Sequence, residues 1–99
     1  MIIAKFGGTS VSTAERLHTI VSIVKKTRGN GVVLVVSAIR GVTDLLLSFP
    51  DASITQRKKI LLQIEQLHQN LADEYWQDTE MPDIQVYLAY CLREIDTAV

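Results

Sequence analysis

Two short β-branched segments, separated by one helix-length stretch, are the feature that most constrains the fold. Residues 1–6 are Met-Ile-Ile-Ala-Lys-Phe, and residues 32–36 are Val-Val-Leu-Val-Val. Between them, apolar residues recur at helical spacing from Ala14 to Val24, and the glycines within residues 29–31 end the repeat. Strand, helix and strand in this order predict a βαβ unit with parallel strands. The unbroken apolar run at 32–36 also predicts a strand that is covered on both faces.

The second half of the chain carries helical signals. Residues 44–49 predict a short helix that Pro50 stops. Apolar residues spaced by three and four predict a long helix over residues 53–76. Residues 81–83, Met-Pro-Asp, break that helix, and the same spacing predicts a last helix over residues 84–96. We therefore assign the chain to the α/β class, as a βαβ unit followed by a helical segment.

A length of 99 residues suits one small domain. We treat the chain as a single segment, with the βαβ unit and its following loop in residues 1–49 and the helices in residues 50–99. Two strands cannot complete a stable sheet, so we expect exposed apolar surface and self-association.

Composition narrows the classes of function. The net charge is −1 and the pI is about 6.1, which argues against the basic surface of a nucleic-acid-binding protein. No apolar run approaches the roughly 20 residues of a membrane span, and the N-terminus lacks the pattern of a signal peptide. We therefore predict a cytoplasmic protein that binds neither nucleic acid nor membrane.

Local patterns give further expectations. Residues 12–15, Ser-Thr-Ala-Glu, fit a capping box at a helix start. Asp44 fits a helix N-cap better than a metal ligand. Cys91, the single cysteine, is expected to be a buried structural residue. His18 and His68 are expected to be ordinary helix residues.

The turn after the first predicted strand suits a phosphate. Gly7 and Gly8 let backbone amides approach a ligand closely, and the N-terminus of the following helix offers further N–H donors. Thr9 and Ser10 add hydroxyl donors, and Lys5 adds a full positive charge. The pattern differs from both the P-loop and the dinucleotide-binding motif. Strand, Gly-Gly and helix therefore predict a phosphate-binding turn, although this sequence pattern also occurs in turns that bind no ligand.

Two motifs give the chain a family resemblance. Residues 5–11, Lys-Phe-Gly-Gly-Thr-Ser-Val, are similar to the N-terminal signature of aspartate kinases within the amino-acid kinase family. Residues 36–46, Val-Ser-Ala-Ile-Arg-Gly-Val-Thr-Asp-Leu-Leu, resemble that family's loop after its second strand. Residues 50–99 carry no motif of the family, and its later motifs and regulatory domains are not found in the sequence.

The resemblance implies roles for individual residues. Lys5 would be the catalytic residue, and no metal ligand is assigned. The residues implied in binding the ATP phosphates are Lys5, Phe6, Gly7, Gly8, Thr9 and Ser10. The residues implied in binding aspartate are Ser37, Ala38 and Thr43.

The resemblance also implies a reaction and its partners. ATP, with Mg²⁺, would phosphorylate the side chain of L-aspartate to 4-phospho-L-aspartate, a step in lysine and threonine biosynthesis. The segment would need the remainder of the kinase domain, would be inactive alone, and would belong to a homo-oligomer. Two alternatives stay open: a short non-catalytic module that binds phosphate or a protein, and a related kinase acting on glutamate, a nucleoside monophosphate or carbamate.

Overall fold

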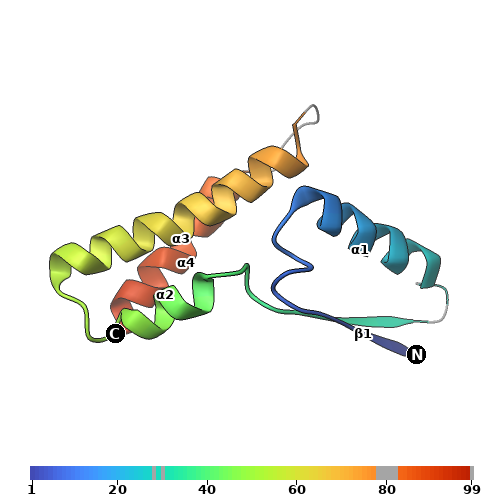
Figure 1. Ribbon diagram of the computed structural model, residues 1–99, viewed down its shortest axis with the longest axis horizontal. Helices are drawn as coiled ribbons and strands as arrows, with labels where there is room; N and C mark the ends of the chain where they lie inside the picture. The colour runs from blue at the N-terminus through green and yellow to red at the C-terminus, as the bar shows by residue number, and fades with distance from the viewer. Residues whose placement is uncertain (28, 30, 78–82, 99) are drawn as a thin grey trace.

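The computed structural model describes residues 1–27, 29, 31–77 and 83–98. A strand, a helix and a second strand come first, and three helices follow (Figure 1). This order confirms the predicted α/β class. In chain order the elements are β1 (Ile2–Phe6), α1 (Ala14–Thr27), β2 (Val32–Val36), α2 (Val42–Ser48), α3 (Ile54–Tyr75) and α4 (Ile84–Ala98).

The two strands pair in parallel, as predicted. The register runs from Ile2 opposite Val32 to Phe6 opposite Val36. One further backbone hydrogen bond follows the last pair, because the Ser37 N–H donates to the Phe6 carbonyl at 3.0 Å. Both strands therefore end at the same level, and the loops that follow them start side by side.

The predicted start of α1 is wrong by one residue. The helix begins at Ala14, and the Thr13 hydroxyl accepts from the Arg16 N–H at 3.2 Å. Thr13 thus takes the capping position that the sequence pattern gave to Ser12. Thr13 and Ser12 both carry hydroxyls at the helix start, and the sequence alone does not show which of them caps the helix.

Helix α2 begins two residues before the predicted start. Gly41 precedes it with φ 93°, a left-handed conformation that favours glycine, and makes no side-chain cap. Asp44 lies inside the first turn of α2, so the expectation that it is the N-cap is wrong. A carboxylate in the first turn still interacts favourably with the positive end of the helix.

The start of α3 agrees with the sequence, whereas one expectation for α4 fails. Ser53 and Gln56 form a reciprocal capping box at the start of α3. Helix α4 begins at Ile84 as predicted, but Cys91 is exposed and not buried. The periodic spacing of apolar residues indicated the helix without revealing how few neighbours cover this face. Residues 81 and 82 of the predicted break before α4 lie outside the described residues. The same holds for residue 30, which belongs to the predicted end of α1.

The hydrophobic core lies among α2, α3 and the turn between them. Its buried residues are Val42, Phe49, Ile60 and Ile64. Leu92 and Ile95 of α4 pack against this cluster. The core therefore holds the helical half together and anchors the start of α2.

The sheet is a separate, thinly covered part of the molecule. The strands and α1 lie at one end of a body measuring 48 × 30 × 21 Å, and the other helices lie at the opposite end (Figure 1). Four residues of β2, Val33 to Val36, are 44 to 55% exposed. The expectation that β2 is covered on both faces is therefore wrong for this chain, because one helix and one partner strand cannot enclose it. The expectation of exposed apolar surface is confirmed.

Candidate functional site

The two motif loops meet beyond the ends of the paired strands. The first loop follows Phe6, and the second follows Val36. The parallel register places both loops at the carboxyl ends of their strands, the usual position of ligand sites in α/β folds. The structure therefore brings together two segments that are about thirty residues apart in the sequence.

Gly8 lies close against the backbone of the second loop. A Cβ atom built on Gly8 would lie 3.1 Å from the Ala38 carbonyl oxygen and 3.8 Å from the Arg40 nitrogen. Both neighbours are backbone atoms, which cannot swing aside as a side chain can. The absence of a side chain at Gly8 thus lets the two backbones pack directly.

Ser12 adds hydrogen bonds to this contact. Its hydroxyl donates to the carbonyl oxygen of Gly8. The Ser12 Oγ atom in turn accepts from the backbone N–H of Arg40 at 3.0 Å. The sequence did not indicate this link, because Ser12 fits a helix cap and Arg40 is assigned no role by the family resemblance.

Lys5 and Phe6 lie on opposite faces of the sheet, because successive strand residues alternate. Phe6 lines a shallow hollow together with Ile20 and other residues of α1, so α1 covers the Phe6 face. Lys5 is exposed on the other face, beside the exposed Ile3. The structure therefore gives Lys5 an open approach and places Phe6 against the helix.

The rest of the first loop forms an open turn. The Ser10 N–H donates to the Gly7 carbonyl at 3.0 Å. A Cβ built on Gly7 would meet no atom within 4 Å, in contrast to Gly8. Thr9 is exposed and Ser10 is half-buried. The Gly7 side of the turn has room for a ligand.

The second loop exposes all three residues assigned to aspartate. Ser37 and Ala38 follow β2, and Thr43 is the second residue of α2. The Val42 N–H donates to the Ile39 carbonyl at 3.0 Å, which closes the turn between Ala38 and Thr43. These residues are accessible, and the closed turn fixes the backbone between them.

The N-terminus of α1 differs from the expected free donor site. The Ala14 N–H donates to Glu74 Oε1 of α3 at 3.2 Å, and Thr13 already caps the Arg16 N–H. A carboxylate here satisfies one amide and would repel a phosphate. Glu74 thereby links α3 to α1.

Removing this carboxylate should lower stability. In Glu74→Ala, the Ala14 N–H loses its partner and the positive end of α1 loses an anion. We expect the free energy of unfolding to fall by about 0.5–1 kcal/mol, measured by urea denaturation. Glu65→Ala is the control, since Glu65 is also exposed on α3. An equal loss in both variants would contradict a specific role for Glu74.

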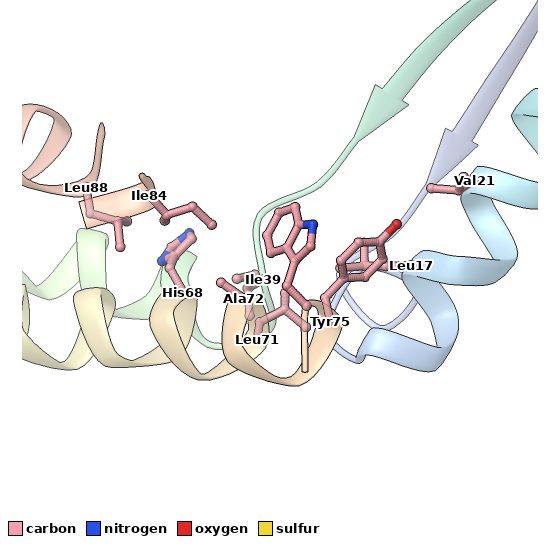
Figure 2. Close-up of a pocket in the computed structure, with 10 residues that line it drawn as sticks. Leu17, Val21, Ile39, His68, Leu71, Ala72, Tyr75, Ile84 and Leu88 are labelled. Carbon is pink, nitrogen blue, oxygen red and sulfur yellow. The ribbon is translucent and has the colours of Figure 1, made fainter. Parts of the chain in front are cut away.

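A second hollow lies between α1, α3 and α4. It has a volume of about 380 Å³ and an almost entirely apolar lining (Figure 2). Leu17 lines it from α1, Tyr75 from α3 and Leu88 from α4. His18 stacks on Tyr75 with ring centroids 4.2 Å apart, so His18 joins α1 to α3. The apolar lining makes this groove a poor match for phosphate or aspartate.

His68 also lines the apolar groove. Its Nδ1 lies 2.7 Å from the Ile64 carbonyl oxygen, one turn earlier in α3. His18 thus contacts a neighbouring helix and His68 contacts its own helix, which agrees with their interpretation as ordinary helix residues.

Two further features are absent from the described residues. No three side chains among His, Cys, Asp and Glu there come together as a metal site. None of the helices in those ranges is both long and apolar enough to span a membrane.

Comparison with known proteins identifies the family. The model of the amino acid kinase family matches residues 1–94. The aspartokinase of Chlamydia pneumoniae is 44% identical over 70 residues, which are 71% of this chain and 16% of that protein. The aspartokinase of Chlamydia muridarum is 38% identical over 73 residues, 74% of this chain and 16% of that protein.

A relative from another bacterium agrees. The aspartokinase of Pseudomonas aeruginosa is 45% identical over 58 residues, 57% of this chain and 14% of that protein. The chain thus spans about one sixth or less of the length of these relatives. No solved structure gave a significant match. The resemblance to aspartokinases is confirmed, and with the match over residues 1–94 the chain belongs to the amino acid kinase family.

Proposed function

We propose that this chain supplies part of both substrate sites of an aspartate kinase. The complete enzyme would transfer the γ-phosphoryl group of ATP to the side-chain carboxylate of L-aspartate, giving ADP and 4-phospho-L-aspartate. The first loop would hold the ATP phosphates, and the second would hold aspartate. The direct contact of the loops at Gly8 and Ala38 carries the proposal, because phosphoryl transfer needs the two substrates to be adjacent.

The proposed roles follow the geometry of the first loop. Lys5 would place its ammonium group near the phosphates from the open face of the sheet. The Gly7 amide would approach the phosphates where its missing side chain leaves space. Thr9 and Ser10 would add hydroxyl donors. Phe6 would act indirectly, by holding the strand end against α1.

The chemistry requires charge neutralisation more than proton transfer. An aspartate side chain has a reference pKa of about 3.9, so it is already an anionic nucleophile at neutral pH. Its attack on an anionic phosphoryl group is opposed by repulsion and favoured by alignment and nearby positive charge. Lys5 would supply positive charge, while Ser37 and Thr43 would orient the attacking carboxylate.

The residues present fit the phosphates of ATP better than they fit a metal ion. Lys5 and the open turn at Gly7 suit an anion, whereas no acidic cluster accompanies them in the described ranges. Mg²⁺ bound to ATP would neutralise charge on the β- and γ-phosphates. We assign it no ligand from this chain.

The proposal is tested by offering several phosphoryl acceptors to the complete polypeptide that carries these 99 residues. ADP release would be followed with aspartate, glutamate and UMP as separate substrates. We expect turnover with aspartate to exceed turnover with either alternative. Faster turnover with glutamate or UMP would assign the chain to another branch of the family, and no turnover with any of them would favour a non-catalytic module.

Thr43 offers a separate test of the second loop. In the complete polypeptide, Thr43→Val removes a hydroxyl while keeping the shape, so we expect the KM for aspartate to rise about tenfold with little change for ATP. A lost hydrogen bond to a charged group accounts for an effect of about that size.

Thr55→Val is the matched control for Thr43→Val. Thr55 is likewise the exposed second residue of a helix, α3, but lies away from the motif loops. Its substitution should leave both KM values unchanged. An unchanged aspartate KM in Thr43→Val would show that the second loop does not bind aspartate through this hydroxyl.

A further inference from the structure

Ser12 stands between the two loops and bonds to both. A hydroxyl group can donate one hydrogen bond and accept others at the same time. Ser12 does both, since it donates to the Gly8 carbonyl and accepts from the Arg40 N–H at 3.0 Å. The side chain is half-buried. Its two partners are backbone groups, so the Ser12 hydroxyl holds the backbone of both loops and not merely a side chain.

The two residues bonded by Ser12, Gly8 and Arg40, also lie close to each other. The position of a Cβ on Gly8 would be 3.8 Å from the Arg40 nitrogen and 3.1 Å from the Ala38 oxygen. Ser12 therefore bonds at the point where the loops already touch. A hydrogen bond on each side prevents the loops from sliding past one another at that contact.

Ser12 is not needed to cap the N-terminus of α1. Thr13 accepts from the Arg16 N–H, so the first turn of α1 is already capped by a side chain. The Ala14 N–H is satisfied by Glu74. The Ser12 hydroxyl is thus directed away from its own helix, to the loops.

We propose that Ser12 is a positioning residue that sets the distance between the phosphate-binding loop and the aspartate-binding loop. This inference rests on the proposed function and extends it to a residue outside both motif assignments. Ser12 itself touches neither substrate. It acts through Gly8 in the first loop and through Arg40 in the second, so its loss should misalign the substrates rather than remove a binding group.

The test compares three variants of the complete polypeptide. Ser12→Ala should lower kcat about tenfold or more, because small misplacements are costly for aligned reactants, with the KM values for ATP and aspartate changed much less. Ser12→Thr keeps the hydroxyl and should restore most of kcat. Thr13→Ala is the control, since it removes the cap of α1 and should lower the midpoint of thermal unfolding while kcat is retained. A kcat within about twofold of wild type in Ser12→Ala would overturn the proposal.

A second measurement separates this proposal from the proposed function. Hydrogen exchange at the Arg40 amide reports the bond to Ser12 without any substrate. It should be severalfold faster in Ser12→Ala than in wild type, and unchanged in Thr13→Ala. Equal exchange in wild type and Ser12→Ala would refute the bridge even in an active enzyme. If the wild type binds neither substrate, but exchange at Arg40 is still faster in Ser12→Ala, the kinase assignment and the positioning of substrates by Ser12 would be refuted while the bridge between the loops would stand.

Discussion

Replacing Lys5 with alanine should lower kcat of the complete polypeptide by about 100-fold or more, the usual scale for losing one preorganised electrostatic group. Lys5 is exposed on the face of the sheet that α1 leaves open, so its ammonium group can reach phosphates beyond the strand end. The carboxylate nucleophile and the phosphoryl group repel each other, and Lys5 is a cation that the chain places at the strand end beside the turn.

Stability should respond very differently to this substitution. Exposed side chains contribute little to folding, so Lys5→Ala should change the free energy of unfolding by no more than about 0.5 kcal/mol. Lys58→Ala is the matched control, because Lys58 is an exposed lysine on α3. It should retain wild-type kcat. Near-wild-type kcat in Lys5→Ala, with the fold intact, would remove Lys5 from the mechanism.

Replacing Phe49 with alanine should cause the largest loss of stability, about 3–5 kcal/mol in the free energy of unfolding. Phe49 is 1% exposed and packs with Ile60 and Ile64 of α3. The Arg57 guanidinium carbon lies 4.9 Å from the centre of its ring. Alanine would leave a cavity and remove this contact, and the core that anchors α2 would loosen.

Leu47 provides the control for Phe49. Leu47 lies two residues before Phe49, in the last turn of α2, but is 71% exposed. Leu47→Ala should change the free energy of unfolding by no more than about 0.5 kcal/mol in the same urea titration. Similar losses for the two variants would mean that the core is not centred on Phe49.

The sequence predicted the elements better than their surroundings. The βαβ unit followed from the apolar run at residues 32–36 and the periodic stretch before it, because both patterns depend on local chain geometry. Burial was less accessible to sequence reasoning. Val33 and Cys91 are exposed although their neighbours are apolar, since burial depends on which other elements cover a face.

In the candidate site, too, the sequence predicted the local features but not the contacts between distant residues. The two motifs identified the loops, and the register of β1 and β2 explains why the loops are adjacent. The contacts that join distant parts were not predictable, because they depend on tertiary placement. Glu74 reaches Ala14 across sixty residues, and Ser12 reaches Arg40 across twenty-eight. A serine next to a threonine at a helix start does not reveal which of them caps the helix.

The most direct test of the account follows the phosphoryl group itself. The complete polypeptide would be supplied with ATP labelled in the γ-phosphate and with L-aspartate, and the acyl phosphate would be trapped with hydroxylamine. We predict labelled 4-phospho-L-aspartate when hydroxylamine is omitted. When hydroxylamine is present, it should displace the labelled phosphate, so that the side-chain hydroxamate forms in proportion to ADP. Lys5→Ala should lose both products. Release of ADP and labelled inorganic phosphate without the hydroxamate would contradict the claim that the two loops together align ATP with aspartate.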